Sequence, residues 1–209
     1  IIPALVGTLR YRKGPYYADA GNFATAGSAE FVYLDSLDEG QISLTLGEHD
    51  YRRLFAGESF AVGDGQLTLA GALTDYDGPW NLDQDLDKRN AMIKYHEAGE
   101  DYSLSITGLA YDNSWDATDQ IPLRAVESGA ISVWGNIDPT AGGESRRNSL
   151  SMDYDSQLDS RSRWQFSAYL MDYALDLYSN FTYFDADPVR GDQFQQTDSR
   201  RVAGIDTQY

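Results

Sequence analysis

The chain has no cysteine and only two histidines, His49 and His96, among its 209 residues. Without cysteine it has no disulfide framework, no thiolate metal site and no cysteine nucleophile. Basic residues are also scarce, because 16 Lys and Arg stand against 33 Asp and Glu, for a formal net charge of -17. Contacts with nucleic-acid phosphates need a basic face, so this balance argues against a DNA or RNA partner.

Long apolar runs are missing as well. No stretch approaches the roughly eighteen apolar residues of a membrane-spanning helix. This excludes helical spans only, because a transmembrane β-strand needs about ten residues with one apolar face. The sequence also begins at Ile1 without a methionine or signal peptide and stops at Tyr209 within an alternating run. We therefore expect a fragment at both ends.

Helical periodicity is nearly absent, whereas apolar and polar residues alternate repeatedly, which indicates an all-β fold. The alternation predicts strands within 41–46, 66–74, 90–96, 102–110, 149–154 and 163–177, and less regular patterns predict strands within 51–60 and 200–209. In the run from Arg163 the apolar phase changes after Leu170, which predicts a β-bulge.

The predicted connections alternate in length along the chain. Short turns are expected at 63–65, 97–100 and 156–160, and long loops at 76–87, 113–144 and 184–197, with a short first connection at 48–50 as the exception. Short turns on one rim and long loops on the other are typical of an antiparallel up-and-down barrel whose ends face different compartments. Chance sorting of the loops is the alternative.

The aromatic residues are mostly tyrosines, with 15 Tyr against 8 Phe and 4 Trp. Such polar-tipped rings suit the headgroup level of a membrane. One set lies beside the short turns and comprises Tyr95, Tyr102, Tyr154 and Trp164; another lies near the long loops and comprises Tyr76, Trp80, Tyr111, Trp115, Tyr173 and Tyr178. We predict two aromatic girdles, although tyrosine is common in any β protein.

The chain opens with a segment of a different kind. It reads Leu9-Arg10-Tyr11-Arg12-Lys13-Gly14-Pro15, then Ala20-Gly21, then Ala26-Gly27-Ser28-Ala29-Glu30-Phe31. This set resembles the end of the plug domain in TonB-dependent outer-membrane receptors, where a basic-Gly-Pro turn leads to small-Gly-small residues and the first barrel strand. The stretches 77–80 and 111–122 look like barrel loops of a proteobacterial branch. Ala20 departs from the pattern, since an aromatic residue often precedes the glycine.

The resemblance implies two domains, with residues 1–36 as the C-terminal remnant of a plug and 37–209 as the N-terminal part of an outer-membrane β-barrel. Such a barrel has about 22 strands, of which about eight are expected here. It also implies active import of a scarce small-molecule ligand, such as a siderophore, vitamin or sugar, across the outer membrane of a Gram-negative bacterium. The implied partners are the TonB energy-coupling protein, reached through a missing N-terminal part, and outer-membrane lipid.

Within the plug motif, Gly14, Gly21 and Gly27 are expected where the backbone needs positive φ or a close approach. Arg12 and Lys13, before Pro15, either pair with carboxylates of a barrel lumen or cap a solvated strand end.

Exposed tryptophans are the best candidates for ligand contact. Trp80, Trp115 and Trp134 are expected in long loops near Asp and Asn, an arrangement that suits sugars or other polar ring compounds. The alternative is that they anchor the loops to the barrel rim. His49 in its acidic loop and acid pairs such as Asp83 with Asp85 are expected to be solvated, although such carboxylates can bind calcium.

The sequence shows no nucleophile elbow, catalytic triad or cofactor motif, so no enzyme, metal site or cofactor is expected. Two alternative functions are consistent with the sequence. One is a passive porin or adhesin-type barrel without a plug, and the other is a soluble β module that binds carbohydrate.

Overall fold

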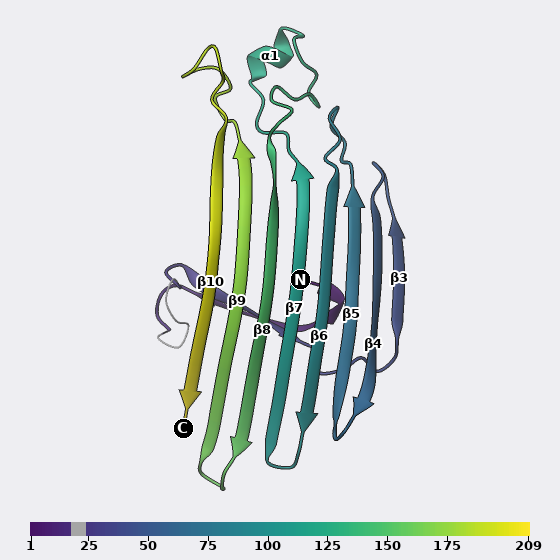
Figure 1. Ribbon diagram of the computed structural model, residues 1–209, viewed down its shortest axis with the longest axis vertical. Helices are drawn as coiled ribbons and strands as arrows, with labels where there is room; N and C mark the ends of the chain where they lie inside the picture. Colours follow the sequence, from purple (N-terminus) through teal and green to yellow (C-terminus); the bar gives the residue numbers. More distant parts are fainter. Residues whose placement is uncertain (18–23) are drawn as a thin grey trace.

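The computed structural model describes residues 1–17 and 24–209. Over these residues the chain is all-β, with one antiparallel sheet of eight strands and a separate two-stranded hairpin (Figure 1). The strands are β1 (Val6–Lys13), β2 (Gly27–Tyr33), β3 (Gln41–Leu46), β4 (Arg52–Val62), β5 (Gly65–Tyr76), β6 (Leu86–Ala98), β7 (Tyr102–Asp116), β8 (Gly142–Gln157), β9 (Arg163–Ser179) and β10 (Phe194–Gln208). The helices of the described part are η1 (Pro3–Leu5) and α1 (Leu123–Glu127). None of its helices has the length and apolar character needed to cross a membrane.

The large sheet is an up-and-down meander, because its spatial order from β3 to β10 is the order along the chain. All of the strands predicted from alternation are present, and the two less regular patterns correspond to β4 and β10. β7 and β8 extend further toward the long loop than predicted, since Asp116 pairs with Gly142. Each added pair satisfies backbone donors and acceptors that a loop would leave to solvent.

The prediction of a β-bulge near Leu170 is wrong. β9 pairs with both neighbours in unbroken register, with Leu170 opposite Leu150 on β8 and Ala203 on β10. The apolar residues change face because the surroundings of the strand change along its length. Beyond Leu170 one face carries Asp172, while the other face takes over the apolar side chains from Met171 onward.

The predicted sorting of the connections is confirmed (Figure 1). Turns at 63–64, 99–101 and 158–162 lie at the lower rim, and the longer loops 77–85, 117–141 and 180–193 lie at the upper rim. The short exception between β3 and β4 is also at the upper rim. There His49 and Asp50 both have left-handed backbones, with φ of 56° and 57°. Two adjacent positive φ values are typical of a type I′ turn, which joins antiparallel strands with two residues.

The hairpin of β1 and β2 lies across one face of the sheet, behind it in Figure 1. We call this the inner face and the opposite one the outer face. Apolar side chains of the N-terminal part pack on the sheet to form one buried cluster, which contains Ile2, Leu5, Leu37, Phe55, Ala72 and Met92. The core therefore lies between the hairpin segment and the inner face.

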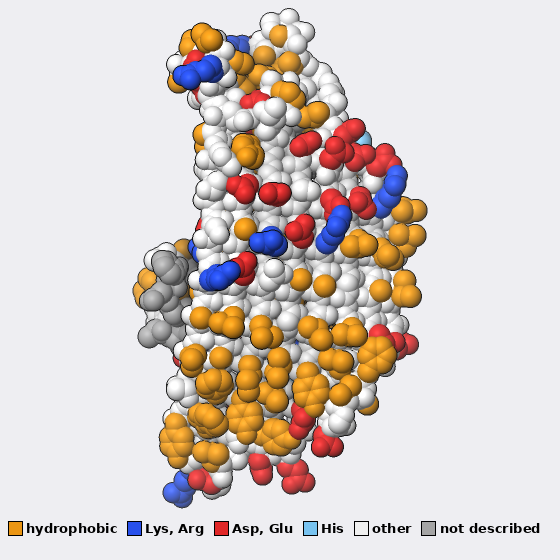
Figure 2. Space-filling model, viewed as in Figure 1, with side chains coloured by type: hydrophobic (Ala, Val, Ile, Leu, Met, Phe, Trp, Pro, Cys, Tyr) orange, Lys and Arg blue, Asp and Glu red, His pale blue; other side chains and the backbone are white. Residues whose placement is uncertain are grey.

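The outer face exposes many large apolar side chains. They gather over the half of the sheet nearest the short turns, as Figure 2 shows. This apolar band includes Leu44, Leu54, Phe60, Leu69, Ile93, Ile106, Leu150, Leu170 and Ile205, whose exposures range from 37% to 77%. The paired register aligns its members across the sheet, for example Leu69 with Ile93 and Leu150 with Leu170.

The apolar band ends at a row of charged side chains on the same face. This charged row comprises Arg52, Asp75, Asp87, Arg89, Asp112, Arg146, Asp172 and Arg201, and Figure 2 shows charged residues above the band. Within it, Arg201 lies 3.1 Å from Asp172 and Arg89 lies 2.6 Å from Asp87. The outer face is thus divided by height into an apolar part and a charged part.

The aromatic set beside the short turns forms a contiguous cluster on the outer face. The rings of Tyr102 and Tyr154 are 6.3 Å apart, and those of Tyr154 and Trp164 are 5.5 Å apart. The set predicted near the long loops is not a second outward belt. Tyr111 and Tyr173 are on the inner face, because both pair with Arg147 in a row that includes buried Asn90. On β7 to β10 the apolar band ends below the loops, so no apolar boundary exists there for a belt.

Candidate ligand-binding site

The turn region of the hairpin contains the basic-glycine motif. Gly14 has φ of +81°, and its N–H donates to the carbonyl oxygen of Ala26 at 2.9 Å. Gly27 has φ of +145°, and a Cβ there would clash with the carbonyl oxygen of Arg12. The predicted backbone requirement is therefore confirmed for Gly14 and Gly27, whereas Gly21 lies outside the described residues.

The basic residues of the motif are exposed at the end of β1. The Arg12 guanidinium lies 5.1 Å from the centre of the Tyr17 ring, within the range of a cation–π contact. Lys13, which like Arg12 precedes Pro15, makes no ion pair with residues of 1–17 or 24–209. Pairing of these two side chains with lumen carboxylates stays a prediction.

Gly27→Ala is expected to destabilise the pairing of β1 with β2 by about 1–3 kcal/mol, because an L side chain is strained at this φ and meets backbone rather than a flexible side chain. Hydrogen exchange of the hairpin amides measures this loss. Ser28→Ala is the matched control at the next residue. Equal exchange in the two variants would contradict the strain at Gly27.

The hairpin is joined to the sheet by a buried lysine that sequence reasoning did not identify. Lys94 of β6 has a side chain only 5% exposed, and its Nζ donates to the carbonyl oxygens of Tyr33 at 3.2 Å and Leu34 at 2.9 Å. It also pairs with Asp35 at 2.9 Å. A lone lysine in an alternating strand gives no sign of this role, since its partners are two carbonyl groups far away in sequence.

A second contact lies beside this hairpin anchor. The Leu37 N–H donates to Ser59 Oγ at 2.8 Å, and Ser59 and Thr68 share a hydrogen bond of 2.7 Å. Thr68 is almost fully buried. Buried polar groups are tolerated where they are satisfied in this way, so the chain leaving β2 is held firmly against the inner face.

Two of the three residues predicted to contact ligand, Trp80 and Trp134, lie against each other at the upper rim. Their ring centres are 5.6 Å apart at an interplanar angle of 57°. The two loops are also joined by backbone, because the Asn81 N–H donates to the Trp134 carbonyl oxygen at 2.9 Å. Trp134 is 48% exposed, which leaves a ring face for a ligand, while Trp80 is half-buried and ties the loops together.

Trp115 is not in a loop, in contrast to its predicted place. It belongs to β7, which continues to Asp116 because those residues pair with the start of β8. Its ring packs over Gly143, where a Cβ would lie 3.1 Å from the indole. An aromatic side chain covering a cross-strand glycine stabilises a sheet that lacks a side chain there.

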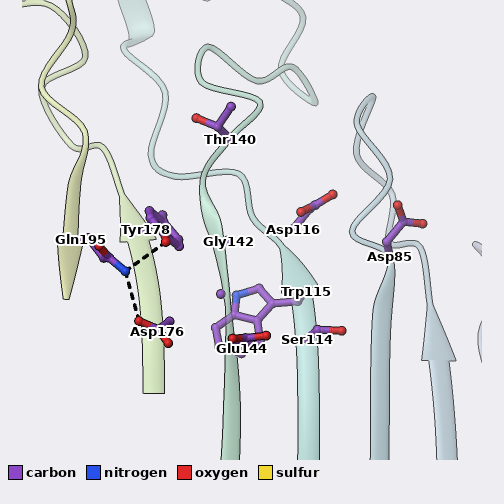
Figure 3. Close-up of a pocket in the computed structure, with 11 residues that line it drawn as sticks. Asp85, Ser114, Trp115, Asp116, Thr140, Gly142, Glu144, Asp176, Tyr178 and Gln195 are labelled. Atoms are coloured by element: carbon purple, nitrogen blue, oxygen red, sulfur yellow. Dashed lines mark hydrogen bonds between the residues drawn. The ribbon is translucent and has the colours of Figure 1, made fainter. Parts of the chain in front are cut away.

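Trp115 lines a pocket of about 470 Å³ at the loop ends of β7, β8 and β9 (Figure 3). Gln195 donates to Asp176 at 3.1 Å and to the Tyr178 hydroxyl at 2.9 Å in this pocket. The other charged lining residues are Asp85, Asp116 and Glu144. Carboxylates and an amide suit a hydroxylated or cationic ligand. Nowhere in the described chain do three His, Asp or Glu side chains lie close enough together to hold a metal ion.

The β9–β10 loop is organised around one carboxylate. Asp192 accepts hydrogen bonds from the backbone N–H groups of Ala186 and Asp187 and from the Thr182 hydroxyl. These donors lower the pKa of Asp192 from 3.8 to about 2. A lowered pKa stabilises the folded loop fully above pH 3.8, and this stabilisation is lost as the pH falls through about 2.

We expect the amide proton shifts of Ala186 and Asp187 to titrate with a midpoint at about pH 2, which NMR in detergent micelles measures. Asp192→Asn should give at pH 7 the shifts that the unmodified loop shows only below that midpoint. Asp185→Asn is the control, because this carboxylate accepts no hydrogen bond from the described residues. A midpoint near 3.8 would contradict the role of Asp192.

A second cavity, of about 620 Å³, lies between the hairpin and the inner face. Its lining includes Phe31 and Tyr33 from the hairpin, and Tyr111, Arg147 and Tyr173 from the sheet. Sequence reasoning did not bring these residues together, because their common face depends on strand register. The sequence did indicate that Arg147 and Leu150 lie on opposite faces of their strand, because they are three residues apart. It did not indicate which residues are the neighbours of Arg147.

No family model matches the chain, and neither a curated protein nor a solved structure matches it.

Proposed function

We propose that this chain is part of a TonB-dependent outer-membrane receptor that actively imports a scarce small-molecule ligand. Residues 1–36 are then the end of the plug, and residues 37–209 are the first eight strands of a larger barrel. The ligand enters past the long loops, and coupling to the TonB protein displaces the plug. The proposal involves no covalent chemistry and no cofactor.

The apolar band of the outer face is the observation that carries this proposal. Soluble monomeric proteins rarely expose contiguous apolar patches larger than a few hundred Å². The band's height also suits a bilayer. On β7 it runs from Tyr102 to Ala110, which is roughly 26 Å along the strand and roughly 20 Å at a tilt of about 40°, close to the 25 Å of transmembrane barrels. The aromatic cluster and the charged row then lie at its two interfaces.

The inner face supports a plugged barrel over a passive pore. It is more polar than the outer face at the same height, as in barrels with a water-filled interior. The hairpin segment is held on it by Lys94 and Ser59. In the described sheet, β3 and β10 each have one unpaired edge, and further strands of the barrel would pair with both.

The first test is to express the full open reading frame that contains this chain, fractionate the membranes, and compare unheated with boiled samples on a gel. We expect an outer-membrane protein with a heat-modifiable band. A monomeric product that stays in water without detergent would overturn the membrane proposal and favour the carbohydrate-binding module, for which the exposed Trp134 ring is the best contact.

A second test separates active import from a passive porin. The chain has no cysteine, so Ser28→Cys introduces a unique thiol into it on the hairpin. We expect its labelling by a membrane-impermeant maleimide to rise in energised cells that contain TonB. Labelling that is the same in cells without TonB would contradict active coupling.

A further inference from the structure

We infer that the cavity between the hairpin and the inner face binds a small aromatic anion, with Arg147 as the residue that recognises its negative charge. This inference rests on the proposed function, because it names the class of ligand that the receptor takes up.

Strand register builds the recognising surface. Tyr111 on β7, Arg147 on β8 and Tyr173 on β9 are direct cross-strand neighbours on the inner face, and Arg200 on β10 continues the row. The Arg200 guanidinium lies 5.2 Å from the centre of the Tyr173 ring. The row therefore alternates tyrosine with arginine, and Arg147 stands between two aromatic rings.

The charge of this part of the inner face is opposite to that of the whole chain. From the Arg147 row to the loops, its cations are Arg53, Lys88, Arg147 and Arg200, and its one acid is Asp198. Asp198 is already paired with Arg200. Arg147 has no ion pair with any described residue. In a chain with a net charge of -17, this local excess of positive charge favours an anionic ligand.

The side chains around Arg147 define the rest of the ligand. A guanidinium binds a carboxylate through two parallel hydrogen bonds, which requires a planar anionic group. Tyr111 and Tyr173 beside it, with Phe31 and Tyr33 across the cavity, offer ring faces and edges to an aromatic body. A cation or a neutral sugar would leave the arginine without a counter-charge.

The acidic loops do not prevent such binding. Arg147 lies five residues along β8 from its start at Gly142, which is roughly 17 Å at the usual rise per residue. At physiological salt, exposed charges are largely screened beyond about 8 Å. The loop carboxylates therefore act weakly on an anion that has reached the row.

The test uses the purified full-length protein in detergent micelles, with salicylate as the aromatic anion and benzylamine as a cation of similar size. We expect saturation-transfer NMR to show salicylate binding, with benzylamine at least about tenfold weaker. Equal or tighter binding of benzylamine would overturn the inference. Absence of salicylate binding, as when another part of the protein covers the row, would also overturn it.

Two adjacent arginines supply a matched pair of variants. Arg147→Gln should weaken salicylate binding by about tenfold or more, because it removes a charge-assisted contact while keeping a polar side chain of similar reach. Arg146→Gln lies on the outer face, in the charged row near Asp172, and should leave binding unchanged. Unchanged binding in Arg147→Gln would show that salicylate is held elsewhere.

This measurement needs neither TonB nor a membrane potential, so it can fail separately from the proposed function. If the protein is a heat-modifiable outer-membrane protein but does not bind salicylate, only the proposed ligand class is wrong. If the protein binds salicylate through Arg147 but does not enter the membrane, the proposed import function is wrong and the anion site is still supported.

Discussion

Ile106→Arg is expected to lower the free energy of unfolding by about 2–4 kcal/mol when the full-length protein is folded into lipid vesicles, which is the cost of an arginine at the bilayer midplane. Ile106 lies on the outer face of β7, in the middle of the apolar band, with Tyr95 and Met152 as its cross-strand neighbours. Reversible denaturant unfolding from vesicles measures this change.

Ser114→Arg is the matched control for height. Ser114 belongs to the same strand and the same face, but it lies beyond Asp112 of the charged row. In water an exposed surface substitution changes stability by about 0.5 kcal/mol or less. Equal losses in the two variants would mean that the apolar band contacts no lipid, and the membrane proposal would fall with it.

Lys94→Met is the second substitution with a large expected effect. It removes the ammonium that donates to Tyr33 and Leu34 and pairs with Asp35, and it leaves carbonyl groups without their donor. Hydrogen bonds to a charged group are worth about 1.5–3 kcal/mol, so the free energy of local detachment should fall by about 2–3 kcal/mol. Native-state hydrogen exchange of residues 33–37 measures local opening of this kind.

Lys88→Met controls for loss of a positive charge on the same strand and face. Lys88 is half-buried and forms no ion pair with the described residues, so the hairpin should exchange as in the unmodified protein. If Lys94→Met also left exchange unchanged, the hairpin would be held by its other contacts, the apolar cluster and the Leu37–Ser59 hydrogen bond. Accelerated exchange confined to 33–37 would identify Lys94 as the anchor.

Most of the sheet could be predicted from the sequence because alternation reports directly on which faces of a strand meet water. β9 departs from this simple pattern. There the apolar residues occupy even positions up to Leu170 and odd positions from Met171 onward. If the same face were apolar along the whole strand, this change would require one extra residue, a β-bulge. The strand instead leaves the apolar band on its outer face at Asp172, while its inner face becomes apolar at the same height.

The candidate site was less predictable for a related reason. Gly14 and Gly27 could be identified because glycine in a turn has a local backbone meaning. Lys94 and Arg147 could not, because their roles depend on which strand lies opposite and on what covers that face. A single sequence shows the parity of a residue but not its cross-strand partners.

The division of the outer face by height has a consequence for how the loops can change. Above the charged row, β7, β8, β9 and β10 continue for several residues before their loops begin, which separates those loops from the apolar band along the outer face. The loops at the ends of these strands could therefore vary in length and composition independently of the apolar part of the sheet. The apolar band on the outer face would be unaffected by such a change.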